Sequence, residues 1–231
     1  MLLILPVDRE IRAIALGTVA AMWIALTIYG SAVIGANWFI RSQNRLKSRA
    51  VALTFDDGPD PAVTPAVLSV LKEKRVPATF FLIGEKAEKY PHLVRQILAD
   101  GHEIGNHSYS HSYWLGFFSA DKLREDLVRC SRVLEEISGE KIRLFRPPFG
   151  VTNPRYSRAL ASLALVSVGW SLRSYDTVTG SSARLLARLV SGVRGGRIVL
   201  MHDTLPQTAE ALPSFLDYCR DKGIEIGRLS M

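Results

Sequence analysis

The chain has 231 residues, 48% apolar and 22% charged, which suits one α/β domain with a short appendage and excludes a disordered chain. Cys130 and Cys219 are too few for a disulfide scaffold and lack C-x-x-C spacing, although a single bridge between them stays open. The net charge is +7, but much of the excess precedes residue 50. The remainder carries no cluster of basic and aromatic residues, so we expect no nucleic-acid partner.

The amino-terminal segment is apolar. No charged residue occurs between Ala13 and Ile40, which exceeds the roughly 20 residues that a membrane-spanning helix needs. Trp38 and Phe39 stand near its end, where an interfacial aromatic belt would lie. The stretch is longer than the apolar core of a signal peptide and lacks a clear A-x-A cleavage pattern. We therefore favour the interpretation of residues 1–40 as a retained membrane anchor. An uncleaved or cleaved signal and a buried core helix are the alternatives.

Charges flank this anchor on both sides. Arg9 and Arg12 precede it, partly offset by Asp8 and Glu10, and residues 41–49, interpreted as a basic linker, add four basic residues. By the positive-inside rule, this pattern favours a cytoplasmic location for the domain that follows.

Residues 50–231 alternate short apolar runs with amphipathic stretches, which predicts one β/α domain. The expected strands are 50–55, 78–83, 102–105, 143–146, 163–169, 198–201 and 224–226. The expected helices are 64–74, 85–99, 120–138, 154–161, 182–193 and 206–222. About seven such units favour a closed or nearly closed parallel barrel, while an open doubly wound sheet would show the same alternation.

Polar residues follow the predicted strands where each strand ends. They are Asp56, His107, Arg146, Asp176 and His202. In a barrel the carboxyl ends of the strands converge on one face, so five separate loops would contribute to one site.

Two of these loops predict a metal site. The adjacent carboxylates of Asp56 and Asp57 repel each other unless a cation compensates them. His107 and His111 have H-x3-H spacing and can face one divalent ion, and Asp57 would complete a two-His, one-carboxylate site with positions open for water and substrate. A surface Asp-Gly-Pro turn and two ordinary polar histidines are the structural alternatives.

Two further loops place a cation and an imidazole beside this site. Arg146 precedes two prolines and Gly150. The prolines make the turn rigid, and the glycine permits close approach of a ligand to the backbone. The alternative is a rigid turn in which the arginine has no functional role. His202 ends a buried strand, where a histidine is either a satisfied core residue or a catalyst. His92 and His102 are not spaced to join the site, and we interpret them as structural or exposed.

The four motifs, taken together with a fifth, resemble those of the polysaccharide deacetylases with a NodB homology domain, carbohydrate esterase family 4. They are Thr54-Phe-Asp-Asp-Gly-Pro59, His107-Ser-Tyr-Ser-His111, Arg146-Pro-Pro-Phe-Gly150, Trp170 with Asp176, and Leu200-Met-His202. The resemblance covers about residues 50–231. It implies a distorted (β/α)7-type barrel and metal-dependent hydrolysis of N-acetyl groups from amino-sugar polysaccharides such as peptidoglycan, chitin-like oligomers or exopolysaccharide.

The resemblance also implies roles for the polar residues. Asp57, His107 and His111 would hold a divalent metal ion, most often zinc. Asp56 would be the general base, and Arg146, together with the metal charge, would keep it ionised.

By the same resemblance, His202 would be the general acid that protonates the departing sugar nitrogen. Asp176 would raise the pKa of His202 and fix its tautomer. A backbone N–H near Phe149 would stabilise the oxyanion, and Leu200 would line the acetyl pocket.

The fourth motif departs from the family pattern, which is usually D-x-x-D-W. Arg173 stands three residues before Asp176, and Thr177 follows it. A wall of the usual sugar groove is therefore missing or rebuilt, with Trp170 or Trp114 as the replacement tryptophan.

Two alternatives accompany the polysaccharide deacetylase hypothesis: a deacylase of a membrane lipid-linked amino sugar, and an inactive carbohydrate-binding homologue. Since polymeric acetylated glycans lie outside the cytoplasm, we expect a single-pass protein of the cell membrane with an extracytoplasmic catalytic domain. This expectation conflicts with the positive-inside pattern.

Overall fold

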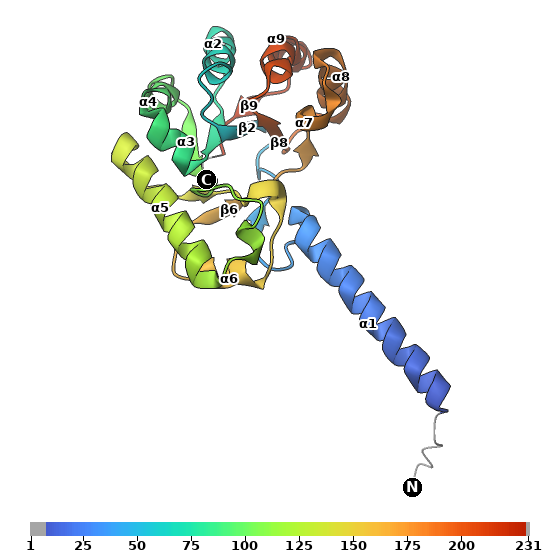
Figure 1. Cartoon of the computed structure of the whole chain (residues 1–231). Helices are drawn as coiled ribbons and strands as arrows, with labels where there is room; N and C mark the ends of the chain where they lie inside the picture. Colours follow the sequence, from blue (N-terminus) through green and yellow to red (C-terminus); the bar gives the residue numbers. More distant parts are fainter. Residues whose placement is uncertain (1–7, 230–231) are drawn as a thin grey trace.

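The computed structural model describes residues 8–229, which form a curled parallel sheet with helices around it and one long projecting helix (Figure 1). The sheet of the described residues has nine strands in the order β1-β6-β5-β4-β3-β2-β8-β7, with β9 beside β2. The strands are β1 (Ser42–Gln43), β2 (Val51–Gly58), β3 (Thr79–Leu82), β4 (Glu103–Asn106), β5 (Leu144–Phe145), β6 (Val166–Val168), β7 (Leu172–Arg173), β8 (Ile198–His202) and β9 (Ile226–Gly227).

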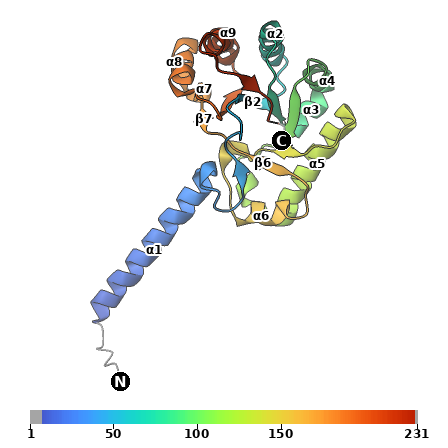
Figure 2. The same ribbon diagram turned by 180° about the vertical axis from the view of Figure 1, so that it is seen from behind.

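Helices cover the outside of the sheet (Figures 1 and 2). The α-helices are α1 (Arg9–Ala32), α2 (Thr64–Lys74), α3 (Gly84–Lys89), α4 (Pro91–Ala99), α5 (Ala120–Ser138), α6 (Pro154–Leu160), α7 (Asp176–Thr179), α8 (Ser182–Gly192) and α9 (Pro206–Asp221). The described part of the chain also has three single turns of 3-10 helix, η1 (Ile34–Ala36), η2 (Leu115–Phe117) and η3 (Pro148–Gly150).

The expected distorted barrel is confirmed. Strands β2 to β6 pair in chain order, and β8 and β7 extend the sheet on the other side of β2. The path of paired strands ends at β1 and β7. The barrel is therefore open between β6 and the β7–β8 side of the sheet. The segment that begins with β1 partly closes this opening, because β1 pairs with β6 and Arg45 forms an antiparallel bridge with Arg197 just before β8.

Residues 41–49, predicted as a basic linker, are in part built into the domain. Ser42 is buried, and its Oγ lies 2.8 Å from the Oγ of Ser167 on β6. The N–H of Leu46 donates to the carbonyl of Gly196 (2.8 Å). The sequence did not indicate this strand because two residues are too few to show a periodicity.

The other predicted elements differ from the structure mainly at short segments. The single helix expected over 85–99 is two helices, α3 and α4, which meet at Tyr90 and Pro91. Pro91 has no N–H for an intrahelical hydrogen bond, so it begins a new helix. The sequence also did not predict β7 and α7, which have two and four residues. Cys130 and Cys219 are free and buried, so the bridge that the sequence left open does not form in this structure.

Strand β2 connects the apolar core to the polar interior of the barrel. Leu53 and Phe55 point outward into the core under the helices, whereas Ala52 faces inward with Val168 and Ile198. The alternation of a strand puts Thr54 and Asp56 on the same inward side as Ala52, and both side chains bond Arg146 there. The barrel interior therefore changes from apolar to polar toward the carboxyl end of β2.

Helix α1 is long and apolar enough to cross a membrane, as the sequence predicted. Asp8 caps its amino end, and the Asp8 carboxylate accepts a hydrogen bond from the N–H of Glu10 (3.2 Å). Its apolar window is not buried against the body, and Figure 1 shows the helix projecting away from the barrel.

Candidate active site

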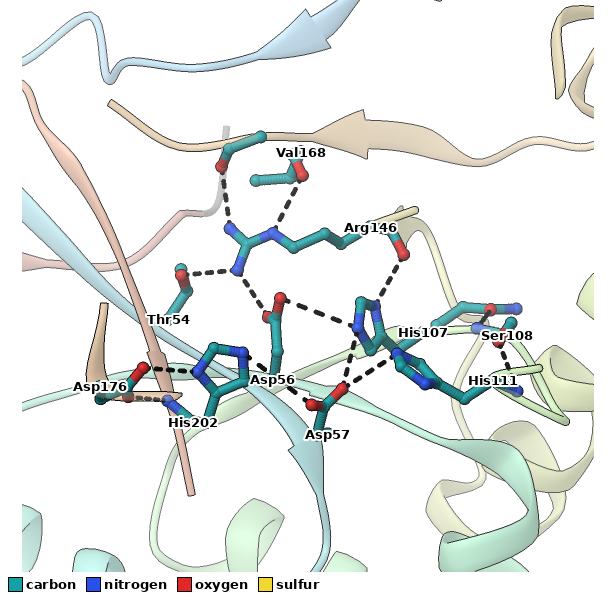
Figure 3. Close-up of polar contacts among 12 residues, drawn as sticks. Thr54, Asp56, Asp57, His107, Ser108, His111, Arg146, Val168, Asp176 and His202 are labelled. Atoms are coloured by element: carbon teal, nitrogen blue, oxygen red, sulfur yellow. Dashed lines mark hydrogen bonds and ion pairs between the residues drawn. The ribbon is translucent and has the colours of Figure 1, made fainter. Parts of the chain in front are cut away.

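A bulge at the end of β2 directs two neighbouring carboxylates into one cavity. The register of β2 against β3 shifts between Asp56 and Gly58, and Asp57 has a left-handed backbone with φ of 71°. Consecutive side chains of a regular strand point to opposite faces, and a bulge breaks this alternation. Asp56 and Asp57 thus both face the group of side chains in Figure 3.

The loop after β4 brings two histidines to the same place. Ser108 and His111 have positive φ angles of 66° and 46°. The Oδ1 of Asn106 accepts a hydrogen bond from the N–H of Ser108 (2.8 Å), and the Oγ of Ser108 accepts one from the N–H of His111 (3.1 Å). These bonds fold the H-x3-H segment into a tight loop in which His107 and His111 approach the same carboxylate.

Asp57, His107 and His111 form a cluster that fits a divalent cation. Their ligand atoms lie within 4.8 Å of one another, with Asp57 Oδ1 3.3 Å from His107 Nε2 and 3.1 Å from His111 Nε2. His107 Nδ1 pairs with the carbonyl of Arg146 (2.8 Å), which leaves the lone pair of Nε2 toward the cluster.

Two properties of individual ligand atoms support this fit. The Nε2 of His111 is buried and has no hydrogen-bond partner within residues 8–229, despite its short distance to Asp57. Such an orphaned ring nitrogen is satisfied when it binds a metal ion. Burial by itself raises the pKa of Asp57, but the two imidazoles outweigh burial and hold this pKa well below its usual range. The carboxylate is therefore available as an anionic ligand.

Asp56 has a different partner. Its Oδ1 accepts a hydrogen bond from Nη1 of Arg146 (2.7 Å), and the guanidinium is completely buried. Its Oδ2 is not used in this ion pair and lies 3.8 Å from His107 Nε2, on the side of the metal cluster. Arg146 donates to three further acceptors: the carbonyls of Val168 and Gly169 and the hydroxyl of Thr54. Its charge and orientation are thus fixed beside Asp56.

His202 is held by a buried carboxylate. Asp176 Oδ1 lies 2.8 Å from His202 Nδ1, and its Oδ2 accepts from the N–H of His202 (2.7 Å) and the hydroxyl of Thr208 (2.9 Å). Burial alone lowers the pKa of His202, but its hydrogen bond and charge interaction with Asp176 outweigh burial and raise the pKa to about 9. The other ring nitrogen, Nε2, is left toward the cavity, 3.9 Å from Asp57 Oδ2.

One cavity of about 570 Å³ collects these side chains. Of the residues given a catalytic, metal-binding or substrate-binding role from the sequence, it is lined by Asp56, Asp57, His107, His111, Phe149, Leu200 and His202. Arg146 and Asp176 are fully buried and contact the site through Asp56 and His202. His92 and His102 do not belong to the cluster among the described residues.

The lining of the cavity includes one of the two tryptophans that the sequence offered as a replacement in the fourth motif. Trp170 lines the cavity together with Arg173 and Thr177, whereas Trp114 does not. Gly150 has φ of 68°, and a Cβ there would lie 2.2 Å from the ring of Trp170. Glycine is therefore required for this tryptophan to pack on the turn.

Sequence reasoning missed several lining residues, and two of them, Lys86 and Tyr113, make specific contacts at the site. Nζ of Lys86 donates to the carbonyl of Asp57 (2.8 Å), and Tyr113 stacks on Phe149 with 5.3 Å between ring centroids. A lone lysine in a short helix carries no signal of this contact. Tyr113 lies only two residues after His111, and that proximity was the available signal.

Comparison with known proteins gives one family. A profile described as polysaccharide deacetylase matches residues 43–168. A peptidoglycan-N-acetylglucosamine deacetylase of Bacillus cereus is 34% identical over 177 residues, which are 75% of this chain and 64% of the relative. The match thus spans less than two thirds of that protein. A chitooligosaccharide deacetylase of a Bradyrhizobium species is 33% identical over 78% of this chain and 88% of its own.

Solved structures agree with this result. The peptidoglycan deacetylase PdaC of Bacillus subtilis is 30% identical, with a TM-score of 0.74 over 79% of this chain and 89% of that one. A protein of Bacillus anthracis described as a CE4 family pseudoenzyme is 28% identical, with a TM-score of 0.75 over 80% of this chain and 66% of that one. Similarity of fold thus extends to a protein described as lacking activity.

Proposed function

This chain belongs to the polysaccharide deacetylase family, and on that premise we propose that it hydrolyses N-acetyl groups of an amino-sugar glycan such as peptidoglycan, a chitin-like oligomer or an exopolysaccharide. The observation that carries the proposal is the cluster of Asp57, His107 and His111, with Asp56 and His202 beside it in one cavity. An inactive homologue would not need an intact base and acid there.

The three clustered residues would hold a divalent cation, and two imidazoles with one carboxylate suit zinc. When bound, such an ion polarises the acetamide carbonyl and lowers the pKa of a water molecule. His107 presents Nε2 because its Nδ1 proton is engaged by a backbone carbonyl. The chain thereby orients the ligand before any ion arrives.

Asp56 would take the proton of the attacking water at Oδ2, since Oδ1 is occupied by Arg146. A base in this position must remain ionised, and the buried guanidinium compensates its charge. Proton transfer of this kind typically contributes about 10² to 10⁴ in rate.

His202 would donate the proton of Nε2 to the departing sugar nitrogen, because an amine leaves poorly as its anion. Asp176 accepts a hydrogen bond from Nδ1 and keeps the imidazole charged. A backbone N–H near Phe149 would stabilise the oxyanion, an effect of about 3 kcal/mol for one donor in other enzymes. Leu200 and Trp170 would form the walls against the acetyl group and the sugar.

We also propose that α1 anchors the chain in the cell membrane and that the body lies outside the cytoplasm. The length and composition of α1 support the anchor. The location follows from where polymeric acetylated glycans occur.

The test is the release of free amines from a panel of N-acetylated glycans by the purified full-length protein. Asp56→Asn should lower the rate about 100-fold or more, because it removes the proton acceptor and keeps the shape of the side chain. Asp121→Asn, at an exposed position on α5, is the matched control and should retain the wild-type rate. Glycan binding by the wild type without amine release from any substrate would instead identify a binding homologue.

A further inference from the structure

The carboxyl end of α1 is attached to the loop that carries Phe149. The N–H of Thr152 donates to the carbonyl of Ser31 (3.0 Å), and its hydroxyl lies 3.5 Å from the carbonyl of Gly30. Gly30 packs on Trp38 so closely that a Cβ would lie 2.6 Å from the indole. The helix therefore leaves the body at a defined point beside the active site.

No spacer separates the apolar part of α1 from this point. The side chains of the helix are exposed along nearly its whole length, and Gly30 is its one buried residue. Figures 1 and 2 show the helix projecting from the body and meeting it at the carboxyl end. If α1 spans a bilayer, the loop of Phe149 and Thr152 is held next to the bilayer surface.

Three exposed aromatic residues lie beside this loop, and we call them the aromatic rim. Tyr113, Trp114 and Phe117 have exposed fractions of 85%, 69% and 73%. Tyr113 stacks on Phe149, and the rings of Trp114 and Phe117 pack together with 5.8 Å between centroids. Aromatic side chains of this kind gather at membrane interfaces, where an apolar ring meets polar headgroups.

Hydrogen bonds fix the rim to the segment that holds α1. The carbonyl of Gly116, within the rim segment, accepts from Nδ2 of Asn153 (2.7 Å) and from Nη1 of Arg155 (3.3 Å). Asn153 directly follows Thr152, the residue bonded to α1. The rim and the membrane helix are thus connected through one short stretch of chain.

The rim is also close to the reacting groups. The ring of His111 lies 4.7 Å from that of Phe149, which lies 5.3 Å from that of Tyr113. Two ring contacts therefore connect a metal-site histidine to the rim. A sugar that protrudes only slightly from a bilayer surface could reach the cavity from this side.

We propose that the aromatic rim sits in the bilayer interface and that the cavity takes an acetamido sugar carried by a lipid in the same bilayer. This inference rests on the proposed function and narrows its substrate class. Two observations support it together, namely the attachment of α1 beside the cavity and the exposed aromatic residues next to that attachment. A free polymer would require neither.

The first experiment measures the depth of the rim in full-length protein reconstituted into lipid vesicles. A spin label at Phe117→Cys should be accessible to oxygen and shielded from a water-soluble relaxation agent. A label at Val128→Cys, an exposed apolar position on α5 that is not part of the rim, should show the reverse. Equal exposure of both labels to the aqueous agent would contradict the proposal.

The second experiment compares two substrates in the same vesicles: a lipid-anchored N-acetylglucosamine oligomer and the same oligomer free in solution. The double variant Trp114→Ser with Phe117→Ser should lose about tenfold or more of its activity on the anchored substrate, because its interfacial contact is weakened. Its activity on the soluble oligomer should change less than about twofold, since neither residue lines the cavity. Val128→Ser should change neither activity.

These outcomes separate the inference from the proposed function. Amine release from the soluble oligomer, with no preference for the anchored one and no effect of the rim variant, overturns the inference alone. Absence of amine release from both substrates by the wild type overturns the proposed function as well.

Discussion

Asp56 and Asp57 are neighbours in the chain but have different surroundings. The bulge at Asp57 directs it to two imidazoles, whereas Asp56 remains in the strand and meets a buried arginine. One carboxylate is thereby suited to bind a cation and the other to accept a proton. The environment, rather than the residue type, separates the two roles.

We propose that Asp176 is a positioning residue for His202, and its replacement should change the pH profile. Asp176→Asn removes the charge that contributes most to raising the pKa of His202 to about 9, so burial, which lowers this pKa, is then opposed only by the smaller charge interactions with Asp56 and Asp57. The acid is active when protonated, so its activity is present below the pKa and lost above it. We expect the alkaline limb of kcat/KM to move by more than about one pH unit to lower pH.

The matched control for this variant is Thr208→Val, which removes another hydrogen bond to Asp176 without removing its charge. Its alkaline limb should stay near that of the wild type. If Asp176→Asn lowers the rate equally at every pH, Asp176 acts only through folding and its assigned role is wrong.

At the scale of elements, amphipathic periodicity predicted the longer helices well. Helices α2 and α5 begin and end at the predicted residues. The helix over 85–99 was wrong because the effect of Pro91 was underestimated. Strands β1 and β7 were missed because pairing with neighbours, rather than a local pattern, defines a two-residue strand.

The candidate site was more predictable than these short elements. The motif residues reach one cavity because they follow parallel strands that end on one face. Sequence could not reveal the bulge at Asp57 or the contact of Lys86 with its carbonyl, since both depend on tertiary packing. The sequence also provided no reason to prefer Trp170 or Trp114 as the tryptophan of the sugar groove, and of these two only Trp170 lines the cavity.

Truncation tests whether β1 belongs to the domain. A chain that begins at Gly30 keeps β1, the buried Ile34 and the bonds to Thr152, whereas one that begins at Lys47 loses them all. The unfolding midpoint of the shorter chain should be at least several degrees lower. Without Ser42, the buried hydroxyl of Ser167 loses its hydrogen-bond partner, and the edge of β6 is uncovered. Identical unfolding midpoints would show that residues 30–46 are dispensable for the fold.

At the scale of the whole molecule, the attachment of α1 makes membrane orientation part of the function. The four basic residues that follow the helix favour a cytoplasmic body, whereas the proposed substrate lies outside. We predict that protease added to intact spheroplasts digests the body. A cytoplasmic protein in the same cells serves as the control for lysis, and full protection of the body would reverse the proposed location.

The central claim is that Asp57, His107 and His111 bind one divalent cation on which amine release depends. The most direct measurement is the metal content of the full-length protein, determined together with amine release during stepwise return of zinc to a chelated sample. We predict that activity rises in proportion to bound metal and saturates at about one ion per chain. His111→Ala should lose both metal and activity, and His92→Ala, at an exposed histidine outside the cluster, should keep both. Undiminished amine release from the metal-free protein would contradict the account.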